Sequence, residues 1–245
     1  MDNLFVVIPA YNEEANIDLV AEEWHRIVEK VGAESKLVII DDGSKDATFQ
    51  KLTELSTRLP KLIAISKENT GHGGTVLYGY KYALENGADY VFQTDSDGQT
   101  IADEFWPFWE NRTKYDIQLG YRKNRKDGLG RIIVTRVLKL ILFLSFGSWI
   151  TDANTPFRLM EKQKLSQYYK LIPENYNLAN VLLTVFYEKS NSKVRYLKIT
   201  FRQRQGGVNS INMKRIFRIG RQAIKDFGSL RSQVKTVKQA KRLEK

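Results

Sequence analysis

Along the first half of the chain, short apolar runs alternate with segments in which apolar residues recur every three or four positions. The runs predict buried strands, and they cover Leu4–Pro9, Leu37–Asp41, Leu62–Ser66, Tyr90–Thr94 and Asp116–Gly120. The segments between them predict helices after Asn12, after Asp46 and after the glycines at 71–74. This alternation predicts an α/β fold around a mainly parallel, doubly wound central sheet.

Clusters of polar residues follow the predicted strands and indicate where a ligand would bind. They cover residues 11–13, 41–44, 69–71 and 95–99. In an open α/β sheet, ligands bind beyond the carboxyl ends of the strands. One crevice at that edge of the sheet is therefore expected to collect all of these clusters.

The sharpest cluster is Asp95-Ser96-Asp97-Gly98-Gln99, in which two carboxylates and then an amide oxygen follow a strand. Hard oxygen ligands of this kind suit Mg²⁺ or Mn²⁺ bridging a diphosphate. A metal held there would stabilise the charge on a departing nucleoside diphosphate. An Asp-x-Asp triplet alone also fits a solvated turn, so its position after a strand is what favours a metal site.

Other residues at this edge allow a structural and a functional interpretation. Asp41 and Asp42 can accept hydrogen bonds from a ribose or a base, because two adjacent acids need compensation. Asp46 is expected to cap a helix that begins at Ala47. Asn12 either caps the first helix or contacts the ligand.

The glycine-rich loop at residues 69–74 permits a ligand to approach the backbone closely before a helix begins. It lacks the spacing of a Walker or a Rossmann fingerprint, which disfavours an ATPase or a dehydrogenase. His72 in this loop and His25 are the only histidines of the sequence. A structural role is expected for both.

The composition narrows the class of protein. A hydrophobic content of 42% is enough for a folded core, and the sequence has no cysteine. A disulfide-stapled scaffold, a thiolate zinc site and a cysteine nucleophile are therefore excluded. The first residues have neither a basic region nor a long apolar region typical of a secretory signal, so we expect the catalytic part to stay on the cytoplasmic side.

The net charge of +11 is concentrated in the C-terminal tail, residues 213–245. The tail has eleven Lys or Arg against Asp226 and Glu244, and its apolar residues recur at largely helical spacing. Such a tail can bind anionic lipid or nucleic acid, or can pack on the domain. No aromatic and basic recognition module for nucleic acid is evident, so nucleic-acid binding is disfavoured.

A second apolar segment, residues 132–150, is a candidate for an interfacial helix. The longest uncharged apolar stretch of the chain, Leu140–Thr151, is too short to span a bilayer, which takes about 20 residues, so no transmembrane span is predicted. We expect residues 1–212 to form the catalytic domain and residues 213–245 to form amphipathic helices on an anionic membrane surface.

Three segments together resemble glycosyltransferase family 2, and the combination is more specific than any one of them. They are Val7–Glu14, Asp41–Thr48 and Asp95–Gln99. The resemblance covers roughly residues 4–210 and is strongest to the dolichol-phosphate mannose synthase and bacterial polyprenyl-phosphate glycosyltransferase group. It implies an inverting enzyme with a glycosyltransferase A (Rossmann-like) fold.

Later segments resemble motifs of the same group. Gly120-Tyr121-Arg122 resembles Gly-Ser-Arg, and Arg131 with Thr135 resembles an Arg-x-x-x-Ser pair that receives a lipid phosphate. The segment Asp152–Arg158 resembles Asp-x-x-Ser-Gly-Phe-Arg, and Arg204–Asn209 resembles Arg-x-x-Gly-x-Ser. The sequence departs from these motifs at Tyr121, Thr135, Thr155-Pro156 and Asn209, which bears on the acceptor and the sugar more than on the fold.

The resemblance and the residues assign roles to individual side chains. The expected catalytic residues are Asp97, Asp152, Arg122, Arg131 and Thr135. The expected donor-binding residues are Pro9, Tyr11, Glu13, Asp41, Asp42, Asp95, Ser96 and Arg204. The expected ligands of Mg²⁺ or Mn²⁺ are Asp95, Asp97 and Gln99.

The leading hypothesis is transfer of a sugar from a UDP-, GDP- or dTDP-sugar to a polyprenyl phosphate. An ionised phosphate needs no base, since its second pKa is about 6. The alternative is extension of a lipid-linked or polysaccharide glycan, with Asp152 as the base for a sugar hydroxyl. A hypothesis of another class is a non-catalytic, membrane-bound nucleotide-sugar sensor or scaffold. A homo-oligomer stays open.

Overall fold

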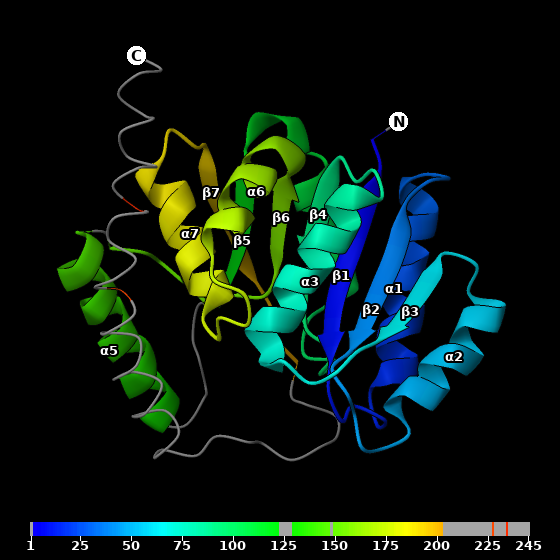
Figure 1. Cartoon of the computed structure of the whole chain (residues 1–245). Coiled ribbons are helices and arrows are strands. Elements are labelled where there is room, and N and C mark those ends of the chain that lie inside the picture. The colour runs from blue at the N-terminus through cyan, green and yellow to red at the C-terminus, as the bar shows by residue number, and fades with distance from the viewer. Residues whose placement is uncertain (1, 123–128, 148, 203–226, 228–233, 235–245) are drawn as a thin grey trace.

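The computed structural model describes residues 2–122, 129–147, 149–202, 227 and 234. Its centre is a seven-stranded sheet in the order β3-β2-β1-β4-β6-β5-β7 (Figure 1). The strands are β1 (Leu4–Ala10), β2 (Lys36–Asp41), β3 (Leu62–Ser66), β4 (Tyr90–Gln93), β5 (Ile117–Arg122), β6 (Arg158–Glu161) and β7 (Val194–Ile199).

Helices follow most of the strands. The α-helices are α1 (Ile17–Val31), α2 (Thr48–Arg58), α3 (Gly71–Glu85), α4 (Trp106–Trp109), α5 (Leu129–Phe146), α6 (Lys162–Tyr168) and α7 (Ala179–Lys189). The short 3-10 helices are η1 (Ala102–Phe105), η2 (Arg112–Lys114) and η3 (Tyr169–Leu171). The element order confirms the predicted α/β class.

The sheet is mainly parallel, with one reversed strand. β3, β2, β1 and β4 run parallel to one another, and β7 runs parallel to β5. Only β6, among the strands that the structure describes, is antiparallel to its neighbours, which are β4 and β5. The reversal places the beginning of β6 beside the end of β4, because Arg158 pairs with Gln93.

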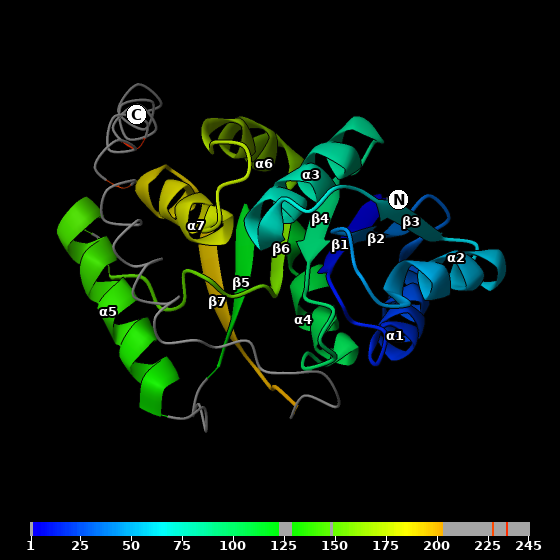
Figure 2. The same ribbon diagram turned by 60° about the horizontal axis from the view of Figure 1, so that its bottom comes forward.

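Two apolar cores cover the faces of the sheet, because side chains of each strand alternate between them. Leu4, Val6 and Ile8 of β1 pack in the core beneath α1 and α2, and Phe5 and Val7 pack in the core beneath α3 and α7. Figure 2 separates these layers, with α3, α6 and α7 on one face and α1, α2 and α4 on the other. The arrangement confirms the predicted mainly parallel sheet with helices on both faces.

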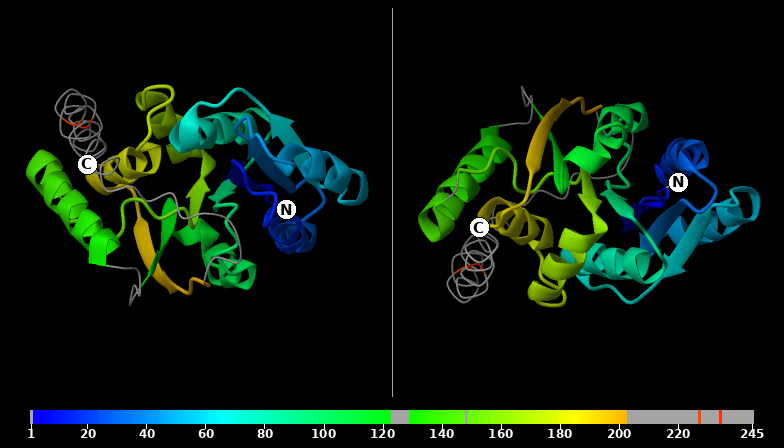
Figure 3. Two further views of the ribbon diagram at one scale, coloured as in Figure 1. Left: turned by 90° about the horizontal axis from the view of Figure 1, so that it is seen from below. Right: turned by 90° about the horizontal axis from the view of Figure 1, so that it is seen from above.

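Helix α5 lies at one end of the domain, beyond α7 and far from α1 and α2 (Figure 3). Leu142 on α5 is buried, and Phe146 packs 5.2 Å from Phe227, measured between ring centroids. Phe227 and Val234 belong to the core on the α7 side, so these two apolar residues of the tail pack on the domain. The rest of residues 213–245, where amphipathic helices were predicted, lies outside the described residues.

The sequence predicted no transmembrane span, and the helices of the described residues bear on this prediction. None of these helices is both long enough and apolar enough to cross a bilayer.

Candidate active site

The strand register brings most of the predicted site to one edge of the sheet. Gln93, at the end of β4, pairs with Arg158, which in turn pairs with Leu119 near the end of β5. Three segments therefore share this edge. They are the acid triplet that follows β4 (Asp95, Asp97 and Gln99), residues 120–122 of β5, and residues 152–157, which precede β6. β1 and β2 run parallel to β4, so the clusters after them lie at the same edge.

The acid triplet forms a tight turn that is fastened to the end of the β7 segment. Asp97 Oδ1 accepts a hydrogen bond from the backbone N–H of Gln99 at 3.1 Å, and Gly98 adopts a φ of +67° between them. Gln99 Nε2 donates to the carbonyl of Arg202 at 3.3 Å, and the N–H of Arg202 donates to the carbonyl of Gln99 at 2.8 Å. The turn is thus joined to Arg202 by two hydrogen bonds, one in each direction.

The donor set of the triplet fits a hard divalent cation. Asp95 and Asp97 supply carboxylates, and the Gln99 side chain, fastened through its NH₂ group, has an amide oxygen. Among the described residues, no group of three or more His, Cys, Asp or Glu side chains is placed to hold a metal ion. A metal at the triplet would therefore complete its coordination with oxygens of the donor diphosphate and with water, as Mg²⁺ commonly does.

His72 is a residue of the site that sequence reasoning did not assign to it. On the first turn of α3, its Nε2 lies 3.1 Å from Asp95 Oδ1, and both side chains are partly exposed. Desolvation lowers the pKa of His72, but the hydrogen bond and the negative charge of Asp95 outweigh it and raise that pKa above 6.5. Only the fold could reveal this pair, since 23 positions separate the two residues.

Asp42 is occupied by contacts within the protein. Its carboxylate accepts hydrogen bonds from the N–H groups of Thr70 and Gly71, both at 2.9 Å, and from Lys67 Nζ. Burial raises its pKa, and the bonds from Lys67 and Thr70 outweigh burial and hold the pKa below 3.8. Asp42 is therefore an anion at the N-terminus of α3, where the helix dipole also favours it.

Asp41 is likewise bound internally. Its carboxylate accepts from the N–H of Ser44 at 3.3 Å and from the hydroxyl of Ser66 at 3.0 Å, and the residue is buried. These contacts provide the compensation that two adjacent acids need. A donor-binding role for Asp41 and Asp42 stays a prediction, with their anchoring of the loops as the observed role.

The loops after β1 and β2 are joined by reciprocal hydrogen bonds. The N–H of Glu14 donates to Asp46 Oδ2 at 3.2 Å, and the N–H of Ala47 donates to Glu14 Oε2 at 3.0 Å. Asp46 also accepts from the N–H of Thr48 at 3.0 Å, but it lies one residue before the N-cap, which is Ala47, because α2 begins at Thr48 and not at the predicted Ala47. The joined loops form one wall of the site.

Asn12 does not cap the first helix, which begins at Ile17. Its φ is +54°, its N–H donates to Ser44 Oγ at 2.9 Å, and its Oδ1 accepts from the N–H of Lys45 at 2.8 Å. The capping interpretation was wrong because the loop places Asn12 against the β2 side. Glu13 is buried, Pro9 lies within β1, and Tyr11 is 44% exposed beside them.

The glycine loop makes its close approach to the protein itself. A Cβ built on Gly73 would lie 1.9 Å from the carbonyl oxygen of Tyr176, and one on Gly74 would lie 2.8 Å from Asn175 Oδ1. The sequence interpretation assigned this room to a ligand. The described structure gives it to residues 175–177, which pack on the start of α3.

The remaining predicted residues differ in how much of them is described. Ser96 and Asp152 are buried at this edge of the sheet. Arg122 ends β5, and Arg131 and Thr135 belong to α5, but their side chains lie outside the described part of the structure. Arg204 lies outside the described residues altogether.

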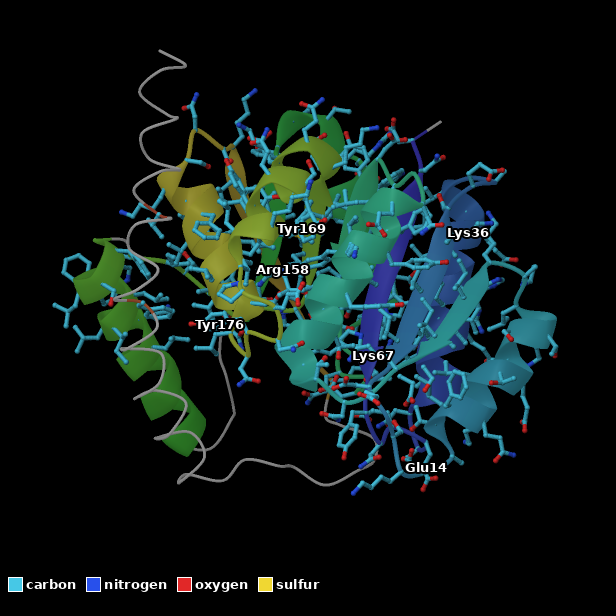
Figure 4. The ribbon with its side chains drawn as sticks, in the orientation of Figure 1. Glu14, Lys36, Lys67, Arg158, Tyr169 and Tyr176 are labelled. Carbon is cyan, nitrogen blue, oxygen red and sulfur yellow. The ribbon has the colours of Figure 1, made fainter. Side chains whose placement is uncertain are left out.

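A surface groove of about 470 Å³ lies on the other flank of α3, away from the acid triplet. Its walls include Lys67, Tyr78, Lys81 and Tyr169, and Figure 4 labels Lys67 and Tyr169. The groove shares Lys67 with the Asp42 network but contains no residue of the triplet. We therefore place the candidate active site at the triplet and not in this groove.

Comparison with known proteins gives a consistent family match. Residues 5–169 match the family described as Glycosyl transferase family 2. The undecaprenyl-phosphate 4-deoxy-4-formamido-L-arabinose transferase of Pectobacterium atrosepticum is 28% identical over 67% of this chain and 50% of its own length. The UDP-N-acetylglucosamine–dolichyl-phosphate N-acetylglucosaminyltransferase of Methanococcus voltae is 32% identical over 66% of this chain and 70% of its own.

A solved structure shares the fold. Glucosyl-3-phosphoglycerate synthase from Mycobacterium tuberculosis, in complex with Mn²⁺, UDP and phosphoglyceric acid, superposes with a TM-score of 0.68. The sequences are 17% identical, and the match covers 94% of this chain and 78% of that one. This chain spans about half the length of the Pectobacterium relative that it matches.

Proposed function

Because this chain belongs to glycosyltransferase family 2, we propose that it transfers a sugar from a nucleotide-sugar donor to a polyprenyl phosphate. The observation that carries the proposal is the fastened turn of Asp95, Asp97 and Gln99 at the carboxyl end of β4. The names of two relatives, which specify undecaprenyl phosphate and dolichyl phosphate as acceptors, support the acceptor class.

The donor would bind along the edge formed by the ends of β1, β2 and β4. Tyr11 is the exposed aromatic side chain there, and it can stack on a base, whereas Pro9, Glu13 and Asp41 shape the wall behind it. Asp95, Asp97 and Gln99 would hold Mg²⁺ or Mn²⁺, which supplies Lewis-acid stabilisation of the leaving diphosphate. The complex of the solved neighbour with Mn²⁺ and UDP supports this class of ligand.

The acceptor phosphate needs no side-chain base, because it is already ionised near neutral pH. One of its oxygens would bond to the anomeric carbon while the bond to the donor diphosphate breaks and the leaving diphosphate takes the electron pair. Attack from the side opposite the diphosphate inverts the configuration. We assign Arg122, Arg131 and Thr135 to the binding of this phosphate and Arg204 to the binding of the donor, since arginine suits forked contacts with phosphate oxygens.

The proposal includes attachment to a membrane through α5 at the end of the domain. Leu140, Phe143, Leu144 and Trp149 are exposed there, and the ring centroids of Phe143 and Trp149 lie 6.0 Å apart. Exposed apolar side chains grouped in this way suit a lipid interface. We expect the basic tail to strengthen binding through its attraction to anionic lipid. We also expect the protein to bind at the cytoplasmic face of the membrane, and the lack of cysteine in the sequence is compatible with this location.

The experiment that tests the function is a donor screen with UDP-, GDP- and dTDP-sugars against undecaprenyl phosphate in anionic vesicles, with products identified by mass spectrometry. The expected product is a glycosyl polyprenyl monophosphate whose formation requires Mg²⁺ or Mn²⁺. A parallel screen offers a glycan hydroxyl as the acceptor. Transfer to the hydroxyl alone, lost in Asp152→Asn, would establish glycan extension instead. Donor binding without transfer to either acceptor would indicate a sensor or scaffold.

A further inference from the structure

The proposed reaction does not use one charged residue that lies deep in the protein. Arg158, at the start of β6, is fully buried, and Figure 4 labels it in the middle of the domain between α7 and α3. Among the described residues no carboxylate forms a direct ion pair with its guanidinium group, and the negative charge of Asp152 acts on it from beyond ion-pair distance. Removing such a cation from water costs several kcal/mol, so its neighbours must compensate.

Neutral oxygens from two places in the chain surround this guanidinium group. Arg158 Nε donates to the carbonyl of Thr155 at 3.0 Å, and Nη2 donates to the same carbonyl and to that of Ala153 at 3.4 Å. Nη1 donates to the carbonyl of Asn180 at 3.1 Å and to the hydroxyl of Thr184 at 3.4 Å. The fork therefore joins the segment before β6 to the first turns of α7.

A second link joins the same two segments. Thr184 is buried, and its one hydroxyl proton lies within reach of two carbonyls, that of Ala153 at 3.0 Å and that of Asn180 at 2.8 Å, measured from Oγ1. Both links end on the backbone of residues 152–157, the segment that carries Asp152. Because Arg158 pairs with Gln93 in the sheet, this backbone lies next to the end of β4, which the acid triplet follows.

The same buried region contains a polar contact that does not touch this segment. The hydroxyl of Tyr80 donates to Gln93 Oε1 at 2.7 Å and lies 3.3 Å from Asn180 Oδ1. Tyr80 is as buried as Arg158. It therefore offers a matched control for the loss of a buried hydrogen bond.

We propose that Arg158 is a positioning residue that fixes the backbone of residues 152–157 on the acceptor side of the active site. It acts through the carbonyls of Ala153 and Thr155 and touches no substrate. A planar fork with donors in several directions can hold these carbonyls together with that of Asn180, whereas the compact ammonium group of lysine cannot span them. The catalytic consequence rests on the proposed sugar transfer, but the structural role can be measured without it.

The first measurement is amide hydrogen exchange by mass spectrometry on Arg158→Lys, Thr184→Val and Tyr80→Phe, with peptides that cover residues 150–158. Exchange in these peptides should accelerate by about tenfold in the first two variants, because each loses hydrogen bonds to this backbone. Tyr80→Phe should leave the exchange at its wild-type rate. Unchanged exchange in a folded Arg158→Lys protein would overturn the proposal.

The second measurement separates acceptor from donor effects in the same variants. kcat/KM for polyprenyl phosphate should fall by about a hundredfold in Arg158→Lys, the scale expected for a displacement near 1 Å. The dissociation constant of UDP should stay within about twofold, since the donor wall is untouched. Equal losses for donor and acceptor would overturn the positioning role and indicate general destabilisation.

The two measurements keep the possible failures apart. If the wild-type protein transfers no sugar, the proposed function fails, while hydrogen exchange still decides whether Arg158 fixes the segment. If Arg158→Lys does not fold, Thr184→Val decides, because it removes one link and leaves the buried charge with its other partners. Wild-type exchange and wild-type acceptor kinetics in Thr184→Val would then overturn the proposal.

Discussion

His72 on the first turn of α3 and Asp95 at the end of β4 meet at 3.1 Å, between the imidazole Nε2 and a carboxylate oxygen. The contact joins the glycine loop to the acid triplet, and no pattern in the sequence predicts it. It also places a titratable imidazole, that of His72, at the edge where we place the donor diphosphate. The chain has only two histidines, so each can be followed by NMR.

The two histidines should titrate on opposite sides of pH 6.5. Burial lowers the pKa of His25, and although Glu29 opposes this effect, that pKa lies below 6.5. The pKa of His72 lies above it, because the bond to Asp95 outweighs desolvation. Proton NMR of the two imidazoles across pH 4–9 measures both values. In Asp95→Asn the midpoint of His72 should fall, and a midpoint that does not move would contradict the contact.

Asp97 should be essential for transfer and dispensable for folding. Asp97→Asn keeps a side-chain oxygen that can accept from Gln99 N–H but removes the negative charge, so we expect kcat to fall by about a hundredfold or more. Asp103→Asn is the matched control, because Asp103 is an exposed acid in the next helix. EDTA should stop the wild-type reaction, and Mn²⁺ or Mg²⁺ should restore it. Full turnover by folded Asp97→Asn in chelator would exclude a metal site here.

The Asp42 anchor should contribute stability at neutral pH that is lost in acid. Its pKa in the folded protein lies below the ordinary 3.8, so the contribution is present above about pH 4 and disappears as the pH falls through the lowered value. Asp42→Asn should therefore destabilise the protein at pH 7 by roughly 3 kcal/mol, and the difference from wild type should shrink below pH 4.

Lys67→Met provides the second arm of this test, because Lys67 Nζ is a partner of Asp42. Urea unfolding of both single variants and of the double variant gives the coupling between the two side chains. Strong coupling is expected, since each single change leaves the other charge of this poorly solvated ion pair without its opposite charge. Additive losses, or a stability difference independent of pH, would show that the carboxylate does not anchor α3.

The sequence predicted the elements whose apolar residues form a clear pattern. The apolar runs predicted β1 to β5 with boundaries within about two residues, because β1, β2 and β4 are buried and the edge strand β3 is still mainly apolar. β6 was missed because its sequence, Arg-Leu-Met-Glu, is short and charged at both ends. Its Arg158 is buried with oxygen partners both from the neighbouring residues 153 and 155 and from α7, and the α7 partners cannot be read from the local sequence.

The candidate site was predictable in composition but not in contacts. The carboxylates of Asp41 and Asp42 suit a ligand in the sequence, yet Ser66, Lys67 and Thr70 already occupy them in the fold. A glycine signals a close approach but does not say to what, and Gly73 meets the carbonyl of Tyr176. Such contacts between distant segments depend on the packing of the whole domain.

The apolar residues that are exposed and can contact a membrane differ from those that the sequence indicated in the tail. Phe227 of the tail is fully buried and contacts Phe146 of α5, so removing the tail would uncover the domain and confuse the test. Leu144 and Trp149 are 69% and 70% exposed and lie at the end of the domain that carries α5. Point substitutions at these two residues therefore test the membrane contact without disturbing the core.

Leu144→Ser with Trp149→Ser should weaken binding to phosphatidylglycerol vesicles by about tenfold or more, because burying a large apolar side chain contributes roughly 1.5–3 kcal/mol. The binding that remains should be electrostatic and should vanish on raising the salt from 0.05 to about 0.5 M, whereas wild-type binding should fall but persist. Vesicle flotation at both salt concentrations measures this. Phe49→Ser on α2, 37% exposed at the other end of the domain, is the matched control and should bind as wild type does. Undiminished, salt-resistant binding by the double variant would mean that α5 does not enter the interface.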